Sequence, residues 1–149
     1  MENLNLPKYY FKTKEINNRK YIFDDIRNKF VILQSEEWVR QHFIQYLIHE
    51  KQYPKLLLSV EKEMSINKNK FRADVVAYNN QLKPILIVEC KAPNVKIEQI
   101  VFEQIATYNI LHRVEYLVVT NGLHHYCCKI NFENKSYEFI KEIPNYGEL

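Results

Sequence analysis

The sequence is poor in glycine and proline, with two glycines and five prolines among 149 residues. So few glycines exclude a phosphate loop of the GxxxxGK type, and the composition leaves little room for disordered segments. Long apolar runs are also missing, because no stretch reaches the length of a signal-peptide core or of a membrane-spanning helix. We therefore expect a folded protein with no membrane association.

Cysteine is too scarce for a disulfide framework. The three cysteines are Cys90, Cys127 and Cys128. Their number is odd, two of them are adjacent, and no CxxC pair occurs, all of which argues against an obligatory disulfide. This pattern favours a reducing compartment, and we expect a cytoplasmic protein.

A strong excess of one charge is missing as well. The 21 Lys and Arg residues exceed the 18 Asp and Glu residues by three, a net charge of +3. That permits an anionic partner but is far below the charge density of a protein that coats nucleic acids. The remaining composition, 46% hydrophobic and 26% charged residues, is typical of one globular domain, here residues 1–149, of the α/β or α+β class.

The first third of the chain predicts a hairpin followed by a helix. Residues 9–14 and 21–33 are rich in aromatic and β-branched side chains around Asn17-Asn18, which indicates a hairpin with an irregular second arm. From residue 36 to about 49, apolar residues recur at helical spacing. The first turn of this helix is expected to hold a hydroxyl and two carboxylates, from Ser35, Glu36 and Glu37.

The middle of the chain predicts three strands, at residues 56–64, 71–78 and 84–91. A polar turn at 67–70 separates the first two, and a short loop at 79–83 separates the last two. The last strand, PILIVECK, is a nearly continuous apolar run. Such a run is expected of a central strand that is buried on both faces.

A second helix is expected from residue 95 to about 112, with Asn94 as its cap. Strands at 114–120, 123–130 and 137–140 then follow, with turns at Asn121-Gly122 and Asn134-Lys135. The whole pattern predicts a central mixed β-sheet flanked by helices, with an N-terminal β-hairpin. The apolar face expected for the second helix comprises Ile97, Ile100, Val101, Ile105, Tyr108 and Leu111.

Charged residues interrupt the apolar strands at their centre. Side chains alternate along a strand, so Glu89 and Lys91 share one face while Cys90 points to the other. If strands 71–78 and 84–91 pair with residue numbers that sum to 163, Asp74 lies opposite Glu89, and Tyr78 opposite Ile85. Two neighbouring carboxylates repel each other unless a cation lies between them.

This set of residues fits metal-assisted hydrolysis of a phosphodiester. Carboxylate oxygens are ligands that Mg²⁺ takes at phosphate-handling sites. A lysine on the same face can orient or deprotonate the attacking water, or stabilise the charge of the transition state. The alternative is that Asp74 ends a turn and that Glu89 and Lys91 form an exposed pair. That reading is the poorer one, because ILIVECKAP places both charges at the end of an apolar run.

Asp74 followed by Glu89-Cys90-Lys91 resembles the PD-(D/E)xK nuclease signature. The surrounding pattern is similar, in order, to the N-terminal nuclease domain of type I restriction enzyme R (HsdR-like) subunits. The resemblance covers roughly residues 31–122, within an expected core of about 31–130. The segments that carry it are SEEWVRQHFIQYLI, YPKLLLSVE, FRADVVAY, ILIVECKAP, QIATYN and YLVVTNG.

The resemblance implies a restriction-endonuclease-like core. In it, Asp74, Glu89 and the backbone carbonyl of Cys90 would ligate Mg²⁺, with Mn²⁺ as a substitute, and Lys91 would assist catalysis. Glu37 matches an acidic helix position that often completes such sites, and Glu36 is its close rival.

Gln104 and Tyr108 match the Q-x-x-x-Y motif of related nucleases, which is thought to position DNA. An i, i+4 pair on one helical face suits that role. Tyr108 could instead pack against the apolar face, and Gln104 could bond a neighbouring loop.

Other residues also have two interpretations. Glu37 could serve only the helix dipole, and Glu61, where the family often has a glutamate, could be an exposed strand charge. Arg72 could touch phosphate or pair with a carboxylate.

A zinc site at His124-His125 and Cys127-Cys128 is rejected, because neighbouring strand residues point to opposite faces. The sequence departs from the family at Ala73 and Ser35, where relatives have proline.

The leading hypothesis is an endodeoxyribonuclease that acts on DNA in restriction or in another DNA-processing role. Without a phosphate loop the chain cannot translocate DNA by itself. It is expected to be either a small free-standing relative or the N-terminal part of something longer, and its initial methionine favours the former. Other restriction subunits are possible partners, and a homodimer would let two sites cut two strands. The first alternative is a metal- and nucleic-acid-binding module or a subunit that is inactive without a partner. The second is an interaction domain whose carboxylates are structural.

Overall fold

The computed structural model describes residues 1–66 and 69–149, except for the side chains at positions 64–66, 69, 71, 108, 111 and 112. Residues 67 and 68 of the expected turn at 67–70 therefore lie outside the described part. Short 3₁₀ turns occur at Lys55–Leu57 and Tyr146–Glu148. The strands and helices are β1 (Thr13–Ile16), β2 (Arg19–Asp24), β3 (Lys29–Ile32), α1 (Ser35–His49), β4 (Leu58–Ile66), β5 (Asn69–Tyr78), β6 (Pro84–Cys90), α2 (Gln99–His112), β7 (Tyr116–Thr120), β8 (His125–Asn131) and β9 (Ser136–Ile140).

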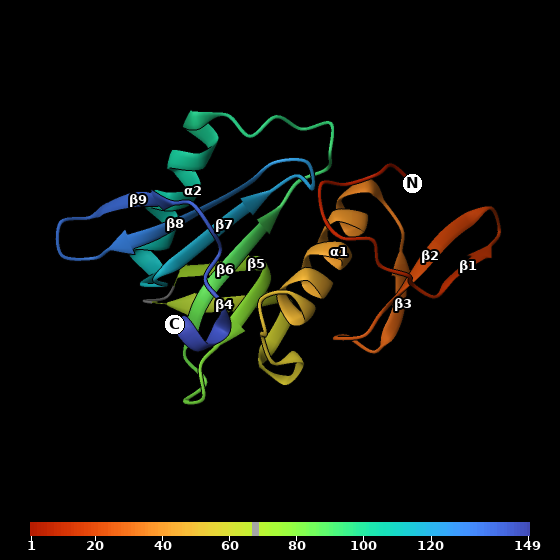
Figure 1. Ribbon diagram of the computed structural model, residues 1–149, viewed down its shortest axis with the longest axis horizontal. Helices are drawn as coiled ribbons and strands as arrows, with labels where there is room; N and C mark the ends of the chain where they lie inside the picture. The colour runs from red at the N-terminus through yellow and green to blue at the C-terminus, as the bar shows by residue number, and fades with distance from the viewer. Residues whose placement is uncertain (67–68) are drawn as a thin grey trace.

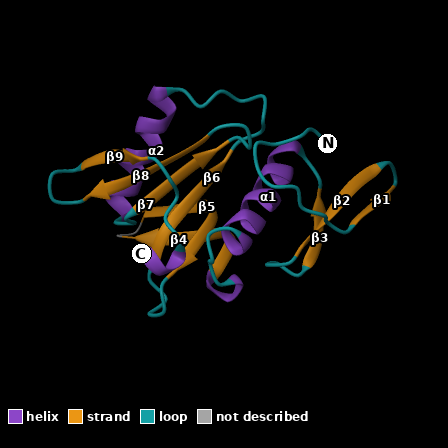
Figure 2. Cartoon of the chain, viewed as in Figure 1, coloured by secondary structure: helices purple, strands orange, loops and turns teal. Residues whose placement is uncertain are grey.

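A six-stranded sheet in the order β4-β5-β6-β7-β8-β9 forms the centre of the molecule. β6 and β7 are parallel, because α2 connects them, and the other neighbours are antiparallel. Figures 1 and 2 show α1 on one face of this sheet and α2 on the other. Each helix closes its own apolar core, with Phe43 and Val88 on the α1 side and Phe102 and Ile87 on the α2 side. The expected mixed sheet flanked by helices is confirmed.

A second, three-stranded sheet in the order β1-β2-β3 lies on the far side of α1 (Figure 1). The expected turn at Asn17-Asn18 is confirmed, and both residues have positive φ, as a two-residue hairpin turn requires. The irregular second arm consists of two strands. The Asp24 carboxylate makes the turn between them by accepting hydrogen bonds from the N–H groups of Ile26 and Arg27.

The N-terminal segment differs from the prediction, because β1 begins at Thr13 rather than at residue 9. The preceding residues cross over α1 and the turn after β7. The N–H of Asn5 donates to the carbonyl of Gly122 at 2.8 Å, and the indole N–H of Trp38 donates to the carbonyl of Glu2 at 3.0 Å. These long-range contacts replace the expected local strand pairing.

The first helix is confirmed, and so is its first turn with one hydroxyl and two carboxylates. Gln34 is the N-cap residue of α1 and makes no side-chain capping bond, so Ser35 lies inside the helix. No helix in the described parts of the chain is long and apolar enough to cross a membrane.

The second helix starts four residues later than predicted, and Asn94 does not cap it. The reason is a contact from a distant loop, because the Asn121 amide donates to the carbonyl of Val95 at 2.9 Å and holds that segment outside the helix. The expected apolar face is also wrong in part. Phe102 and Ala106 are buried, whereas Ile100 is 62% exposed.

The register of β5 and β6 is the expected one over three pairs. Val75 pairs with Val88, and the two following pairs keep the sum of 163. The register then shifts, so that Tyr78 lies opposite Pro84 and not opposite Ile85. The shift follows from a tight loop, in which the Asn79 side chain accepts hydrogen bonds from the N–H groups of Gln81 and Lys83.

Candidate active site

Asp74 lies in β5 where the strand pairing is interrupted on both edges. On the β4 side the described pairs are Val60 with Val75 and Lys62 with Ala73, and Glu61 between them has a φ of 51°. A positive φ at a non-glycine residue costs on the order of 1–3 kcal/mol and is concentrated at functional sites. On the β6 side the pairing begins only at Val75. The sheet therefore opens around Asp74.

The Asp74 carboxylate takes over the contact to β6. Its Oδ2 accepts a hydrogen bond from the N–H of Cys90 at 2.7 Å. The Cys90 thiol itself packs in the α1-side core, where burial raises its pKa well above the usual range. Extending the observed register by one residue brings Glu89 opposite Asp74.

Glu89 is the most strongly perturbed carboxyl of this group. Burial and the charge of Asp74 raise the pKa of Glu89 to about 8, and the Lys91 ammonium offsets part of that effect. Two carboxylates compete for one poorly solvated space, so a proton or a cation stabilises the pair. The structure thus brings together Asp74, Glu89 and Lys91.

Glu36 and Glu37 have different surroundings, although they are neighbours in the first turn of α1. The Glu36 side chain is 46% exposed, and burial and the Asp74 charge raise its pKa, with Arg40 and then Lys91 acting in the opposite direction. The Glu37 carboxylate is nearly buried and accepts hydrogen bonds from two arginines and Gln41. Glu36 therefore faces the Asp74–Lys91 group, while Glu37 is held by its own partners.

Arg40 is a central residue that the sequence reasoning missed. Its Nη2 lies 3.2 Å from Asp74 Oδ1, 3.3 Å from Glu36 Oε1 and 3.6 Å from Glu61 Oε1. Its Nη1 donates to Glu37 Oε1 at 2.7 Å. The side chain is buried, and its Nε has no described hydrogen-bond partner. A sequence signal existed, since Arg40 falls at helical spacing from the buried Phe43 and Leu47.

Further ion pairs link this cluster to the small sheet. Arg27 donates to Asp24 Oδ2 at 2.5 Å, to Glu37 Oε1 at 2.8 Å and to Glu61 Oε2 at 3.3 Å. Burial would raise the pKa of Asp24, but hydrogen bonds from Arg27 and Gln41 outweigh it and lower that pKa. Charges from the small sheet, α1 and β4 thus form one network with Asp74.

The remaining candidate residues lie further out. Arg72 is 68% exposed, and its Nη2 lies 3.2 Å from Glu61 Oε2. Of the two interpretations of Arg72, phosphate contact or carboxylate pairing, the structure shows the carboxylate pairing. Gln104 is exposed on α2, which packs against β7 and β8 rather than α1. Tyr108 belongs to the same helix, but its side chain lies outside the described residues. The side chains of Cys127 and Cys128 enter opposite cores, as strand alternation predicts.

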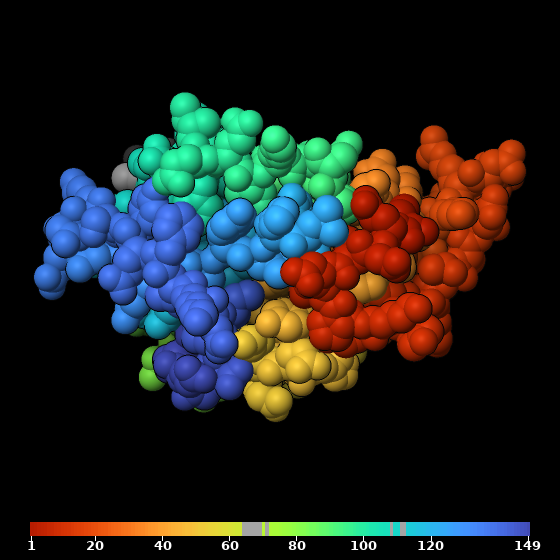
Figure 3. Space-filling view, turned by 45° about the horizontal axis from the view of Figure 1, so that its top comes forward, coloured from red at the N-terminus to blue at the C-terminus, as the bar shows by residue number. Residues whose placement is uncertain are grey.

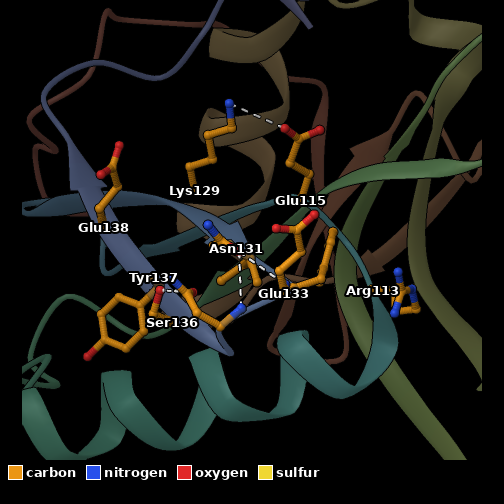
Figure 4. Close-up of a pocket in the computed structure, with 11 residues that line it drawn as sticks. Arg113, Glu115, Lys129, Asn131, Glu133, Ser136, Tyr137 and Glu138 are labelled. Atoms are coloured by element: carbon orange, nitrogen blue, oxygen red, sulfur yellow. Dashed lines mark hydrogen bonds and ion pairs between the residues drawn. The ribbon is translucent and has the colours of Figure 1, made fainter.

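Two hollows differ in their relation to this cluster. One, of about 410 Å³, lies between β3, the start of α1 and β4, and Glu36, Arg40 and Glu61 line it. The other, of about 710 Å³, lies at the turn between β8 and β9 (Figure 4). Its charges are mixed, and Lys129 pairs with Glu115 across 3.5 Å. Only the first of these two hollows borders the carboxylates.

Together, the mixed sheet, the two flanking helices and the charged cluster define an α+β domain of the nuclease-like class. The family profile of the type I restriction enzyme R protein N terminus (HSDR_N) matches residues 35–144. The chain belongs to this family, and it is a restriction-enzyme-related domain of the nuclease type.

A solved structure supports the fold. It is a fragment assigned as the HsdR subunit of a type I restriction enzyme from Vibrio vulnificus YJ016, which is 16% identical in sequence and superposes with a TM-score of 0.54. The match covers 78% of this chain and 24% of that chain, so this chain spans about a quarter of the length of the solved fragment. No curated protein matches the sequence.

Proposed function

We propose that this domain is a metal-dependent endodeoxyribonuclease that hydrolyses phosphodiester bonds of DNA with Mg²⁺, for which Mn²⁺ can substitute. The observation that carries the proposal is the meeting of Asp74, Glu89 and Lys91 at the opening in the sheet. Membership in the restriction-enzyme family supports it.

The donor atoms fit a hard divalent cation. No group of three or more His, Cys, Asp or Glu side chains among the described residues forms a ready metal site. The protein would therefore supply Asp74, Glu89 and one backbone oxygen, as Mg²⁺ sites that retain several waters do. The carbonyl of Cys90 suits this role, because a strand residue directs its C=O and its N–H to the same edge, here toward Asp74.

The charge of the cluster supports the same cation. Six carboxylates face four cationic side chains, which gives a net charge of −2 when all are ionised. A divalent cation would neutralise this charge and relieve the repulsion that raises the pKa of Glu89. The carboxylates are Asp24, Glu36, Glu37, Glu61, Asp74 and Glu89, and the cations are Arg27, Arg40, Arg72 and Lys91.

Lys91, Glu36 and Arg40 have different roles in the proposed reaction. When bound, Mg²⁺ polarises a phosphoryl oxygen and acidifies bound water. Lys91 orients the attacking water or offsets negative charge on the phosphate in the transition state. Glu36, rather than Glu37, holds that water from the side of α1. Arg40 fixes the orientation of Asp74 and is a positioning residue.

The proposed partners follow from the chemistry and the family. The substrate is DNA, other restriction subunits would supply translocation, and a homodimer would bring a second site to the opposite strand. Gln104 and Tyr108 remain candidates for DNA contact.

A second candidate function is a metal- and nucleic-acid-binding module, or a nuclease subunit that is inactive without its partner. The observation that favours it is Arg40, whose guanidinium already lies 3.2 Å from Asp74 Oδ1. A fixed cation at this distance competes with a metal ion for the same carboxylate. A partner that shifts α1 would release that competition.

Cleavage of supercoiled plasmid tests the first proposal. The wild-type protein with Mg²⁺ or Mn²⁺ is expected to nick and linearise the plasmid, whereas Asp74→Ala and Lys91→Ala are expected to be inactive. Lys96→Ala, an exposed lysine at the start of the α2 connection, is the matched control and should cut normally. Titration calorimetry of the same proteins measures Mn²⁺ binding directly. Asp74-dependent binding without cleavage would favour the second function, and no Asp74-dependent binding would contradict both.

A further inference from the structure

We propose that the outer face of the small sheet, formed by β1, β2 and β3, binds an unpaired nucleic-acid strand and leads it to the carboxylate cluster. The second part of this proposal rests on the proposed nuclease function. The first part, strand binding, stands on the composition of the face alone.

Strand pairing defines which residues share this face. Ile22 and Asp24 are fully buried, so the alternating positions of β2 point outward. The pairs Lys14–Tyr21, Ile16–Arg19, Phe23–Phe30 and Tyr21–Ile32 place their side chains on that outward side. Lys12 joins them, because its Nζ lies 5.9 Å from the centroid of the Phe23 ring. The outer face thus consists of Lys12, Lys14, Ile16, Arg19, Tyr21, Phe23, Phe30 and Ile32.

This face is cationic and aromatic. It has three cations and three aromatic rings, and the two carboxylates within its strands, Glu15 and Asp24, lie on the opposite face. Ile16 is 47% exposed and Ile32 is 45% exposed, so the sheet is open to solvent at both edges. Figure 3 shows that the small sheet stands out from the body of the molecule.

The net charge of the protein is concentrated in this part of the chain. Residues 1–34 contain seven Lys and Arg against four Asp and Glu, a net charge of +3. The other 115 residues contain 14 of each and are neutral overall. A modest total charge therefore conceals a local cationic surface, and such a surface attracts the phosphate backbone of a nucleic acid.

The contacts on the face suggest how a strand would bind. The Nζ of Lys14 lies 4.1 Å from the centroid of the Phe30 ring, so the lysine covers the ring through a cation–π contact. A phosphate would attract the lysine away from the ring, and a base could then stack on the ring in its place. Cationic side chains between exposed aromatic rings are the usual elements of single-strand binding surfaces. Bases in a duplex are already stacked on each other, so the face fits an unpaired strand better.

The face continues into the candidate active site. Tyr21, Phe30 and Ile32 also line the hollow of about 410 Å³ at the start of α1. The same hollow is bordered on its other side by Glu36, Arg40 and Glu61. A strand that lies along β3 therefore reaches the carboxylates without crossing the body of the domain.

Fluorescence anisotropy with labelled 20-nucleotide oligo(dT) in EDTA tests the binding, because chelation prevents cleavage. The double variant Lys12→Gln/Lys14→Gln is expected to bind about tenfold more weakly than wild type, with a shallower dependence on salt. Lys20→Gln/Lys96→Gln is the matched control, because it also removes two exposed lysines, one on the opposite face of β2 and one in the connection before α2, and it should stay within about twofold. Equal losses of affinity in the test and control variants would show general electrostatic attraction and would overturn the proposal. No loss of affinity in either variant would also overturn it.

A second variant tests the stacking without removing charge. Phe30→Leu keeps an apolar side chain in the sheet, and it is expected to weaken oligo(dT) binding several-fold, since base stacking on aromatic rings contributes measurably at each position. Duplex DNA of the same length should bind more weakly than oligo(dT), and oligo(U) distinguishes RNA from DNA. Tighter binding of duplex than of both single strands would contradict the proposal.

Asp74→Ala separates this proposal from the nuclease proposal. The variant should bind oligo(dT) like wild type and lack cleavage. If the wild type cleaves DNA but the variants of the face bind oligo(dT) as the wild type does, only the strand-binding proposal is overturned. Face-dependent binding without metal-dependent cleavage would overturn only the nuclease proposal.

Discussion

At the scale of single residues, the site depends on carboxylates held close together by a few buried cations. Arg40 contacts Asp74, Glu36, Glu37 and Glu61 from within α1. Removing one partner of a buried charge network leaves the others uncompensated, which is far more destabilising than loss of an exposed pair.

Substitution of Arg40 by methionine is expected to lower the free energy of unfolding by about 3–5 kcal/mol. The reason is that the carboxylates around it lose their buried counter-charge. Urea denaturation in the absence of metal measures the effect. Arg72→Met is the control, because Arg72 pairs with the same Glu61 but is mostly exposed, and it should change stability by no more than about 0.5 kcal/mol. Similar losses in the two variants would contradict the central role of Arg40.

Glu89 predicts an unusual dependence of stability on pH. Burial and the Asp74 charge raise its pKa to about 8 from 4.5, so the folded state keeps a proton that the unfolded state has already released. That contribution is complete below about pH 4.5 and is lost as the pH rises through about 8. In EDTA, the wild type should lose on the order of a few kcal/mol across this window.

Thermal unfolding at several pH values compares the wild type with Glu89→Gln, in which the decline should be much smaller. Glu63→Gln removes an exposed carboxylate of β4 and should keep the wild-type profile. Addition of Mg²⁺ should restore stability at high pH, because the cation replaces the proton. A flat wild-type profile would show that Glu89 is not held in its neutral form.

At the scale of elements, the turn after β7 is where the N-terminal segment meets the domain. Gly122 has a φ of 85°, and a Cβ at this position would lie 2.7 Å from Leu4 Cδ2 and 3.1 Å from Val39 Cγ2. Gly122→Ala is therefore expected to reduce the free energy of unfolding by about 1–2 kcal/mol through backbone strain and crowding. Gly147→Ala, where a Cβ meets nothing within 4 Å, should be nearly neutral in the same urea titration. Equal stabilities would mean that the N-terminal segment moves aside without loss.

The packing face of α2 can be tested in the same way. Phe102 is buried against the sheet, whereas Ile100 is largely exposed. Phe102→Ala is expected to destabilise the protein by about 3–5 kcal/mol, and Ile100→Ala by less than about 0.5 kcal/mol. A larger loss of stability for Ile100→Ala than for Phe102→Ala in chemical denaturation would support the apolar face expected from the sequence instead.

The elements that the sequence predicts well are those with strong local periodicity. The helix α1 and the strands β5, β6 and β7 follow from apolar spacing alone. The start of α2 does not, because the contact from Asn121 to Val95 is long-range. Neither does β3, because the turn before it is made by the Asp24 side chain and not by glycine or proline.

The same limit applies to the site. Asp74, Glu89 and Lys91 could be selected because they lie in or beside two adjacent strands whose register is short-range. The different surroundings of Glu36 and Glu37 cannot be inferred from the sequence, since they depend on Arg27, which lies in the turn between β2 and β3. The sequence does not single out Arg40, because its importance arises from partners on α1, β4 and β5.

At the scale of the whole molecule, α1 lies between two sheets and contacts both (Figure 1). The small sheet contributes buried residues, including Ile22 and Asp24, and the Arg27 guanidinium that binds Glu37 and Glu61. A chain of residues 35–149 alone is therefore expected to lose several kcal/mol of stability. Circular dichroism during urea unfolding measures this, and an unchanged midpoint would show that the small sheet is dispensable.

The Arg27 contacts also affect how the boundaries of such domains should be drawn. The segment shared with the family begins at residue 35, yet the electrostatic balance at Glu37 and Glu61 is completed by a residue that precedes it. The segment that is similar in sequence is therefore shorter than the segment that contains all the counter-charges of these carboxylates. A chimera or an excised domain cut at the family boundary would inherit the acidic residues of the site without one of the cations that keep them together.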